Sequence, residues 1–163
     1  MRDAGRTDQS SLSVDLACGF WTPSRMWKGF TERAARTSPE SGDPVLAGRT
    51  YAIPFDPVWN AALALSGGGL KGWKLVSADD QLGVIRADVR SPLLPLEANV
   101  LVSVTLDPNG QTRVDMSALG NHRGGDLGAN YRRIRHFFRS LDSSLGVRPG
   151  QILEPRSSAR HAA

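Results

Sequence analysis

Hydrophobic and polar residues alternate in four stretches of the chain, and this pattern predicts four β-strands. The clearest stretch is Val84 to Arg90, where aliphatic side chains alternate with Arg86, Asp88 and Arg90. The other three are Trp73 to Ala78, Asn99 to Leu106 and Thr112 to Ala118. Such alternation is typical of a sheet with one packed face and one solvated face. Because short turns join successive strands, the sheet is predicted to be antiparallel.

A first helix is predicted before these strands, because hydrophobic residues recur there at helical spacing. Its apolar side consists of Val58, Trp59, Ala62, Leu63 and Leu65. Asp56 is expected to cap the free amides at the start of the helix, followed by Pro57, which has no amide hydrogen to leave unpaired. The three glycines at 67–69 are expected to end the helix.

A second helix is predicted after the strands, beginning at Asp126. One side of this helix is hydrophobic and is expected to face the core. That side consists of Leu127, Tyr131, Ile134, Phe138, Leu141 and Leu145. The opposite side is expected to be solvated and carries Arg132, Arg135, Arg139 and His136.

The order of these elements predicts the fold class. With a short strand at Tyr51 to Ile53, the order is β-α-β-β-β-β-α. We expect an α+β domain in which an antiparallel β-sheet of four to five strands has two helices packed on one face, a helix-grip-like arrangement. The domain is expected to span 49–145. It follows a flexible N-terminal segment, 1–48, with a candidate short amphipathic helix, and precedes a disordered C-terminal tail, 146–163.

Composition and charge exclude several function classes. The net charge is only +4 over 163 residues and is not concentrated in one region, so no nucleic-acid partner is expected. A single cysteine, Cys18, excludes an internal disulfide framework. The spacing of histidines, cysteines and carboxylates matches no zinc, calcium or iron site, so no metal and no cofactor are expected.

The N-terminal segment leaves the relation to membranes open. Phe20, Trp21, Trp27 and Phe30 are interspersed with basic residues, which is compatible with peripheral membrane contact or with a helix packed on its own domain. The chain contains no run of about 20 apolar residues of the kind that spans a bilayer. The sequence as it stands therefore predicts a cytoplasmic protein. An envelope-associated protein is the alternative if the start site is misassigned, because Cys18 then follows a lipoprotein-like stretch.

Three polar side chains stand in a row along the second helix, at the border between its core and solvent faces. They are Asp126, Asn130 and Arg133, spaced about one turn apart. Asp126 is expected to cap the helix by accepting the amide of Gly128 or Ala129, and Arg133 to bind a strand-end carbonyl or a partner's carboxylate. Asn130 is expected to bridge the two. The row is interpreted either as a clamp that ties the helix to the sheet or as a polar lip for a ligand.

The glycine-rich turn before this helix contributes two further candidates. His122 lies four residues before Asp126, a pair that is compatible with general-base catalysis. Arg123 would assist an anion bound at the start of the helix, although the charge of Asp126 opposes such binding. Gly128 is predicted to mark the close approach of another backbone.

The segment from Val114-Asp115 to Ile134 resembles the signature of a family catalogued as domain of unknown function 1499, found in bacteria and plastids. The resemblance rests on Asp126-Leu127-Gly128-Ala129-Asn130-Tyr131-Arg132-Arg133-Ile134 and is expected to cover 49–145. The family has no established chemistry, so the resemblance implies relationship and fold more than activity. Some members look like envelope proteins, which adds weight to the alternative localisation.

These observations favour a non-catalytic binding or accessory module over an enzyme. It would use a groove between sheet and helix, in association with the envelope if the start site is misassigned, and its partner would be a protein or a small apolar or amphipathic ligand. The alternative is a small hydrolase-like enzyme that uses His122 and Asp126.

Overall fold

The computed structural model describes residues 33–91, 96–121 and 125–153, which form a seven-stranded sheet with two helices packed against it. The strands are β1 (Ala34–Arg36), β2 (Arg49–Tyr51), β3 (Trp73–Asp79), β4 (Val84–Arg90), β5 (Glu97–Leu106), β6 (Thr112–Gly120) and β7 (Ile152–Leu153). The helices are α2 (Phe55–Ala64), which continues into the π-helical turn η1 (Leu65–Gly69), and α3 (Ala129–Ser144).

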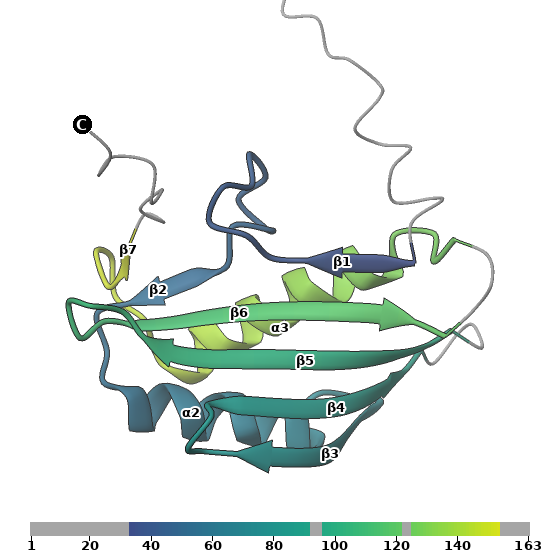
Figure 1. Ribbon diagram of the computed structural model, residues 1–163, viewed down its shortest axis with the longest axis horizontal. Coiled ribbons are helices and arrows are strands. Elements are labelled where there is room, and N and C mark those ends of the chain that lie inside the picture. Colours follow the sequence, from purple (N-terminus) through teal and green to yellow (C-terminus); the bar gives the residue numbers. More distant parts are fainter. Residues whose placement is uncertain (1–32, 92–95, 122–124, 154–163) are drawn as a thin grey trace, which may run out of the picture.

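All strand pairs are antiparallel, and the strands are ordered β3-β4-β5-β6-β2-β7 (Figure 1). β1 also pairs with β6, on the edge that β6 shares with β2. β2 lies beside the first half of β6 and β1 beside its last residues. The long hairpins of β4, β5 and β6 therefore form the centre of the sheet.

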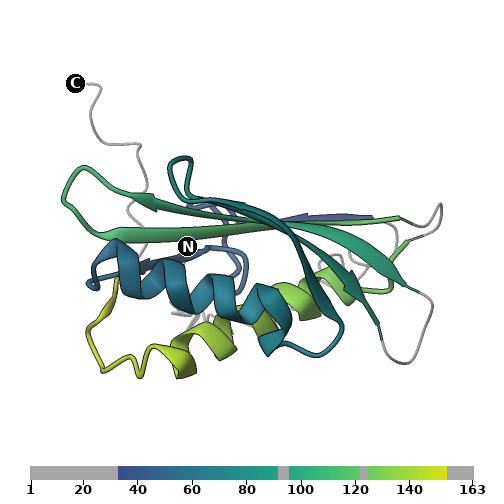
Figure 2. The same ribbon diagram turned by 90° about the horizontal axis from the view of Figure 1, so that it is seen from below.

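Both helices cover the same face of the sheet, as the side view shows (Figure 2). On that face the strand register aligns buried pairs such as Ala87 with Val100 and Val102 with Met116. The alternation in the sequence thus becomes a hydrophobic inner face. This confirms the predicted α+β class with an antiparallel sheet and both helices on one side, although the sheet has seven strands rather than four or five.

The core lies between the inner face of the sheet and the two helices. Trp73 of β3 stacks on Phe137 of α3 with ring centroids 5.5 Å apart, and Phe137 meets Phe138 edge-on at 5.7 Å. Tyr51 is completely buried, and its hydroxyl donates a hydrogen bond of 2.7 Å to Asp142. Aromatic packing thus fixes α3 against β3, and the Tyr51 hydrogen bond fixes it against β2.

The start of α2 corrects the predicted cap. The helix begins at Phe55, so Asp56 lies inside the first turn and makes no capping hydrogen bond. Its carboxylate still lies near the positive end of the helix dipole. Pro57 is the third residue of the helix, two positions later than expected, and is tolerated there because the first amides of a helix have no intrahelical acceptor.

The glycine run ends the helix as predicted, but by way of a π-helical turn. Gly68 has φ of 120°, a conformation that side chains disfavour, and the chain leaves the helix at Leu70 with extended geometry. The Leu70 amide donates to the Leu65 carbonyl at 3.1 Å. This turn directs the chain into β3.

The core face of α3 differs from the predicted one at its first turn. Leu127 precedes the helix, has φ of 53° and is half exposed, so it does not belong to the core. Phe137 was not predicted to face the core, yet it is fully buried and stacks on Trp73 of β3. Ile134, Phe138 and Leu141 are buried as expected. The predicted solvation of Arg132, Arg135, Arg139 and His136 is confirmed.

The sheet extends past the predicted domain bounds of 49–145 at both ends. β1 and β7 both lie outside that range and pair with β6 and β2. Thr37 follows β1 and is buried, with its hydroxyl donating to Asp115 at 2.8 Å. The predicted strand at 51–53 is shifted to Arg49–Tyr51, because Ile53 leads directly into the proline that opens α2.

Burial of Tyr51 generates a prediction about alkaline pH. Desolvation, followed by the hydrogen bond to Asp142, raises the pKa of Tyr51 well above its ordinary value. The folded protein keeps this proton at a pH where the unfolded chain loses it, so the stabilisation is complete below about pH 10 and declines above it, by about 1.4 kcal/mol per pH unit. Urea unfolding from about pH 8 to about pH 11 should show this decline. Tyr51→Phe should be less stable at neutral pH and should lack this component; an unchanged slope would contradict the assignment.

Candidate functional site

Asp126 lies just before α3 and caps it. Its carboxylate accepts hydrogen bonds from the backbone amides of Gly128 at 2.9 Å and Asn130 at 2.6 Å. The amide of Ala129 binds the Asp126 backbone carbonyl instead, at 2.9 Å. Because Asp126 lies before the N-terminus of α3, only Asn130 and Arg133 of the predicted row are on the helix itself. The capping role is confirmed, and the buried carboxylate has both oxygens engaged.

Asn130 is completely buried and connects three segments of the chain. Its Nδ2 donates to the carbonyl of Arg33 at 2.8 Å, and its Oδ1 accepts from Nη1 of Arg133 at 2.6 Å. Nη2 of Arg133 donates to the carbonyl of Leu96 at 2.7 Å, at the start of β5. The expectation that Arg133 binds a strand-end carbonyl is therefore confirmed. Asn130 reaches Arg133 through its side chain but Asp126 only through its backbone amide, and its side-chain amide binds the Arg33 carbonyl instead.

The close backbone approach occurs at Gly120 rather than at Gly128. The Gly120 amide donates to the Arg33 carbonyl at 2.7 Å, and a Cβ on Gly120 would lie 3.3 Å from that oxygen and 3.6 Å from Nδ2 of Asn130. A Cβ on Gly128 would meet only the side chain of Arg132, at 3.4 Å. Gly128 instead has φ of 74°, so glycine is favoured there by its left-handed backbone.

These contacts favour the clamp over the ligand lip. Burial lowers the pKa of the Arg133 guanidinium, while the charge of Asp126 acts in the opposite direction. An arginine remains protonated despite such a shift, so the guanidinium still carries its charge next to Asp126. The polar groups of Asp126, Asn130 and Arg133 are used to cap α3 and to hold it against the starts of β1 and β5.

The other predicted site residues have little structural support. His122, Arg123, Cys18 and the aromatic residues Phe20, Trp21, Trp27 and Phe30 lie outside the described residues. The enzyme alternative needs Asp126 beside His122, but the Asp126 carboxylate already binds two backbone amides. Among the residues that the structure describes, no cluster of three or more histidine, cysteine, aspartate or glutamate side chains is placed to hold a metal ion. None of the described helices has the length and apolar character needed to cross a membrane.

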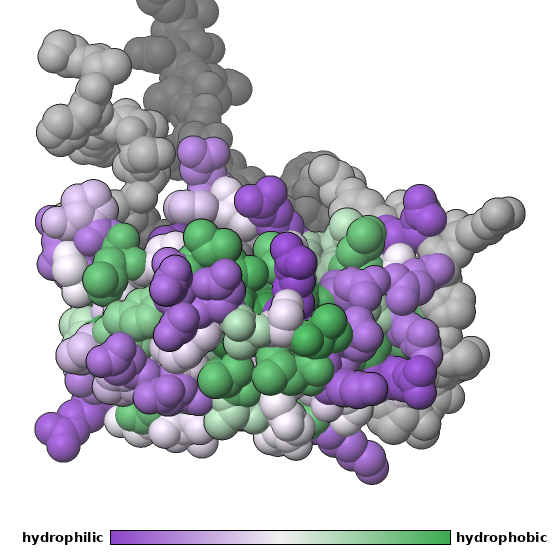
Figure 3. Space-filling model, turned by 60° about the horizontal axis from the view of Figure 1, so that its bottom comes forward, coloured by the Kyte–Doolittle hydropathy of each residue, from purple (hydrophilic) through white to green (hydrophobic). Residues whose placement is uncertain are grey.

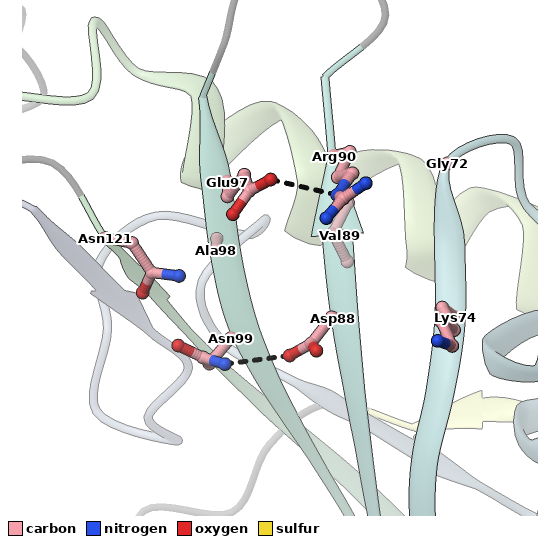
Figure 4. A pocket seen from close by; sticks show the side chains of 9 residues that line it. All are labelled: Gly72, Lys74, Asp88, Val89, Arg90, Glu97, Ala98, Asn99 and Asn121. Atoms are coloured by element: carbon pink, nitrogen blue, oxygen red, sulfur yellow. Dashed lines mark hydrogen bonds and ion pairs between the residues drawn. The ribbon is translucent and has the colours of Figure 1, made fainter.

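A different surface emerges on the outer face of the sheet, the face turned away from α2 and α3. At one end of this face lies a polar depression of about 220 Å³ (Figure 4). Its polar side chains are Lys74, Asp88, Arg90, Glu97, Asn99 and Asn121. Asn99 donates to Asp88 at 2.8 Å, and Nε of Arg90 lies 2.9 Å from Glu97. Neighbouring strands thus supply paired polar groups around an open space.

An apolar depression of about 280 Å³ adjoins it and shares Asp88 and Asn99 with it. Its hydrophobic lining comes from three strands, with Val76 on β3, Leu101 on β5 and Leu119 on β6. These side chains are 58%, 38% and 54% exposed. The outer face therefore presents a hydrophobic patch next to a charged and amide-rich end.

The sequence contained a partial signal for this surface. The alternation in β4 assigns Arg86, Asp88 and Arg90 to the solvated side of the sheet. Leu101 and Leu119 stand at polar-side positions of their strands, and exposed apolar residues in such positions are informative when they cluster. Their clustering depends on the strand register, which the alternation alone does not specify.

A comparison of the chain with protein-family models finds no match, and a search of curated proteins finds none either. The resemblance of the segment from Val114 to Ile134 to an uncharacterised family therefore stays a prediction.

The clamp predicts a large effect from a small substitution. Asn130→Ala would leave the Arg33 carbonyl and the Arg133 guanidinium each without a buried partner, which should lower the free energy of unfolding by about 2 to 4 kcal/mol. Asn60→Ala is the matched control, because Asn60 is exposed on α2 and should tolerate the same change within about 0.5 kcal/mol. Urea unfolding measures both. Equal, small effects would show that the clamp contributes little.

Proposed function

We propose that this domain is a non-catalytic binding module that holds a small amphipathic ligand on the outer face of its sheet. The ligand's apolar part would lie in the apolar depression, and its polar head, carrying negative charge, would lie towards Lys74 and Arg86. The observation that carries this proposal is the direct contact between the two depressions, which share Asp88 and Asn99.

The proposal that the ligand has an apolar part follows from the exposed hydrophobic side chains of the apolar depression. Val76, Leu101 and Leu119 lie on three different strands, yet they line one depression. Covering apolar surface stabilises a complex by about 25 cal/mol for each Å² removed from water, and contiguous patches of this kind mark interaction sites. A hydrocarbon chain or ring that covers these three side chains would gain this stabilisation.

The charge of the ligand's head is inferred from which groups are already paired. Asp88 accepts from Asn99, and Arg90 is paired with Glu97. Lys74 and Arg86 form no ion pair with another side chain in the described part of the chain. These two cations border the polar and the apolar depression, respectively. Asp88 keeps its charge because Asn99 is neutral, so the two depressions together present three cations, Lys74, Arg86 and Arg90, against two carboxylates, Asp88 and Glu97. A negative head group therefore finds the better electrostatic match.

This proposal moves the binding surface away from the groove between sheet and helix that the sequence suggested. The inner face is filled by side chains such as Trp73, Phe137 and Phe138, which pack directly on one another. An accessory role at the cell envelope, and kinship with the uncharacterised family, remain part of the proposal as expectations from the sequence.

Binding of octyl phosphate tests the proposal. This probe combines an eight-carbon chain with an anionic head, and titration followed by NMR should shift the amide signals of β3, β5 and β6 around the apolar depression. Leu101→Ser should weaken binding about five-fold, since the lost apolar contact is worth about 1 kcal/mol. Leu119→Ser should act similarly.

Two controls accompany this titration. Leu127→Ser removes a half-exposed leucine that lines neither depression and should leave the affinity unchanged. Octyltrimethylammonium has the same chain with a cationic head and should bind more weakly than octyl phosphate. Equal affinity for both probes, or indifference to Leu101→Ser, would refute the proposed site.

A further inference from the structure

β3 is an edge strand of the sheet, and its side chains are exposed along nearly its whole length. Only Trp73 is buried, while the residues from Lys74 to Asp79 are all exposed. Leu75 and Val76 are 37% and 58% exposed, and Leu82 in the following turn is 70% exposed. Figure 3, which brings this side of the molecule forward, shows hydrophobic side chains gathered near its middle between hydrophilic ones. An edge strand of this kind is a template for pairing with another strand.

An irregularity in the pairing of β3 with β4 gives this edge an internal symmetry. Leu75 pairs with Ala87 and Ser77 pairs with Arg86, so Val76 is an extra residue in β3. Leu75 and Ala78 lie opposite the buried residues Ala87 and Ile85 and belong to the inner face. Lys74, Val76, Ser77 and Asp79 belong to the outer face. Read in either direction, the strand has the same order of faces: outer, inner, outer, outer, inner, outer.

This symmetry allows β3 to pair with a second β3 about a two-fold axis between Val76 and Ser77. In that antiparallel register every residue meets one that belongs to the same face. Leu75 lies opposite Ala78 of the partner subunit, and Lys74 lies opposite Asp79 of the partner subunit. The register therefore places opposite charges at both ends of the paired segment, and a two-fold axis produces each pair twice.

We propose that the β3 edge is a self-association surface through which two copies of this chain join their sheets. The shared sheet would carry the outer faces of both copies side by side. Because the pairing uses the same edge of both molecules, it closes on itself and stops at two copies. The contact is short, so the dimer is in equilibrium with the monomer rather than permanent.

Exchange of charges at this edge tests the pairing. Sedimentation velocity of the full chain over a range of concentrations should show a monomer–dimer equilibrium. Lys74→Asp and Asp79→Lys should each weaken association about tenfold, since each places two like-charged pairs across the axis. The double variant Lys74→Asp/Asp79→Lys restores opposite charges and should recover association to within about threefold of the parent chain.

Two further variants keep the result interpretable. Asp79 also accepts the Leu82 amide at 2.9 Å in the turn, and Asp79→Asn keeps that acceptor while it removes the charge. It should weaken association without lowering the melting temperature, measured at a concentration at which the parent chain is monomeric. Arg139→Asp makes the same change of charge on the solvated side of α3 and should leave association unchanged.

The proposal fails if the parent chain is monomeric at every concentration, if it forms assemblies larger than two, or if the double variant associates no better than the single ones. Asp79 lines neither the polar nor the apolar depression. The octyl phosphate titration of Asp79→Asn therefore reports on the proposed ligand site independently of the dimer.

Discussion

The carbonyl oxygen of Arg33 holds a central place in this structure. It accepts the Gly120 amide at the end of β6 and the side-chain amide of Asn130 at the start of α3. One backbone atom thus joins the N-terminal strand, the centre of the sheet and the long helix. A Cβ at position 120 would crowd this oxygen at 3.3 Å, so glycine leaves room for the contact, and Asp126 fixes the first turn of α3. Burial of polar groups is tolerated here since each of them has a partner.

Much of the fold could be predicted from the sequence because the physical signals were local and repeated. Alternation over seven or more residues defines β4, β5 and β6, and their faces follow directly from it. The sequence-based predictions are wrong where a single tertiary contact determines whether a strand forms or a side chain is buried. β1 and β7 are too short to have a pattern of their own and exist through pairing with β6 and β2. Phe137 is buried because Trp73 lies across from it, which only tertiary structure reveals.

The candidate sites likewise divide into features that local spacing predicts and features that only the tertiary structure reveals. Asp126, Asn130 and Arg133 were recognisable as a set because helical spacing brings them together. Spacing alone could not decide between a clamp and a ligand site, since both use the same side chains. The outer-face surface required the strand register, which sets Leu101 beside Ser117 and Asn99 beside Leu119. A shift of register by one residue would have moved every one of these side chains to the opposite face.

The edge of β6 is shared between two separate segments, β1 and β2, and this has a mechanical consequence. A tight group of contacts lies between them: Arg113 binds Asp115 through two nitrogens at 2.7 Å and the Ala47 carbonyl at 3.0 Å. The three residues of β1 can therefore peel away under tension on the N-terminus before the Arg113 contacts and β2 are loaded. Such local opening would break the two hydrogen bonds of the Arg33 carbonyl, so its cost includes the loss of the clamp but not of the core. The domain would yield in steps, with its first step confined to the strand that leads to the N-terminal segment.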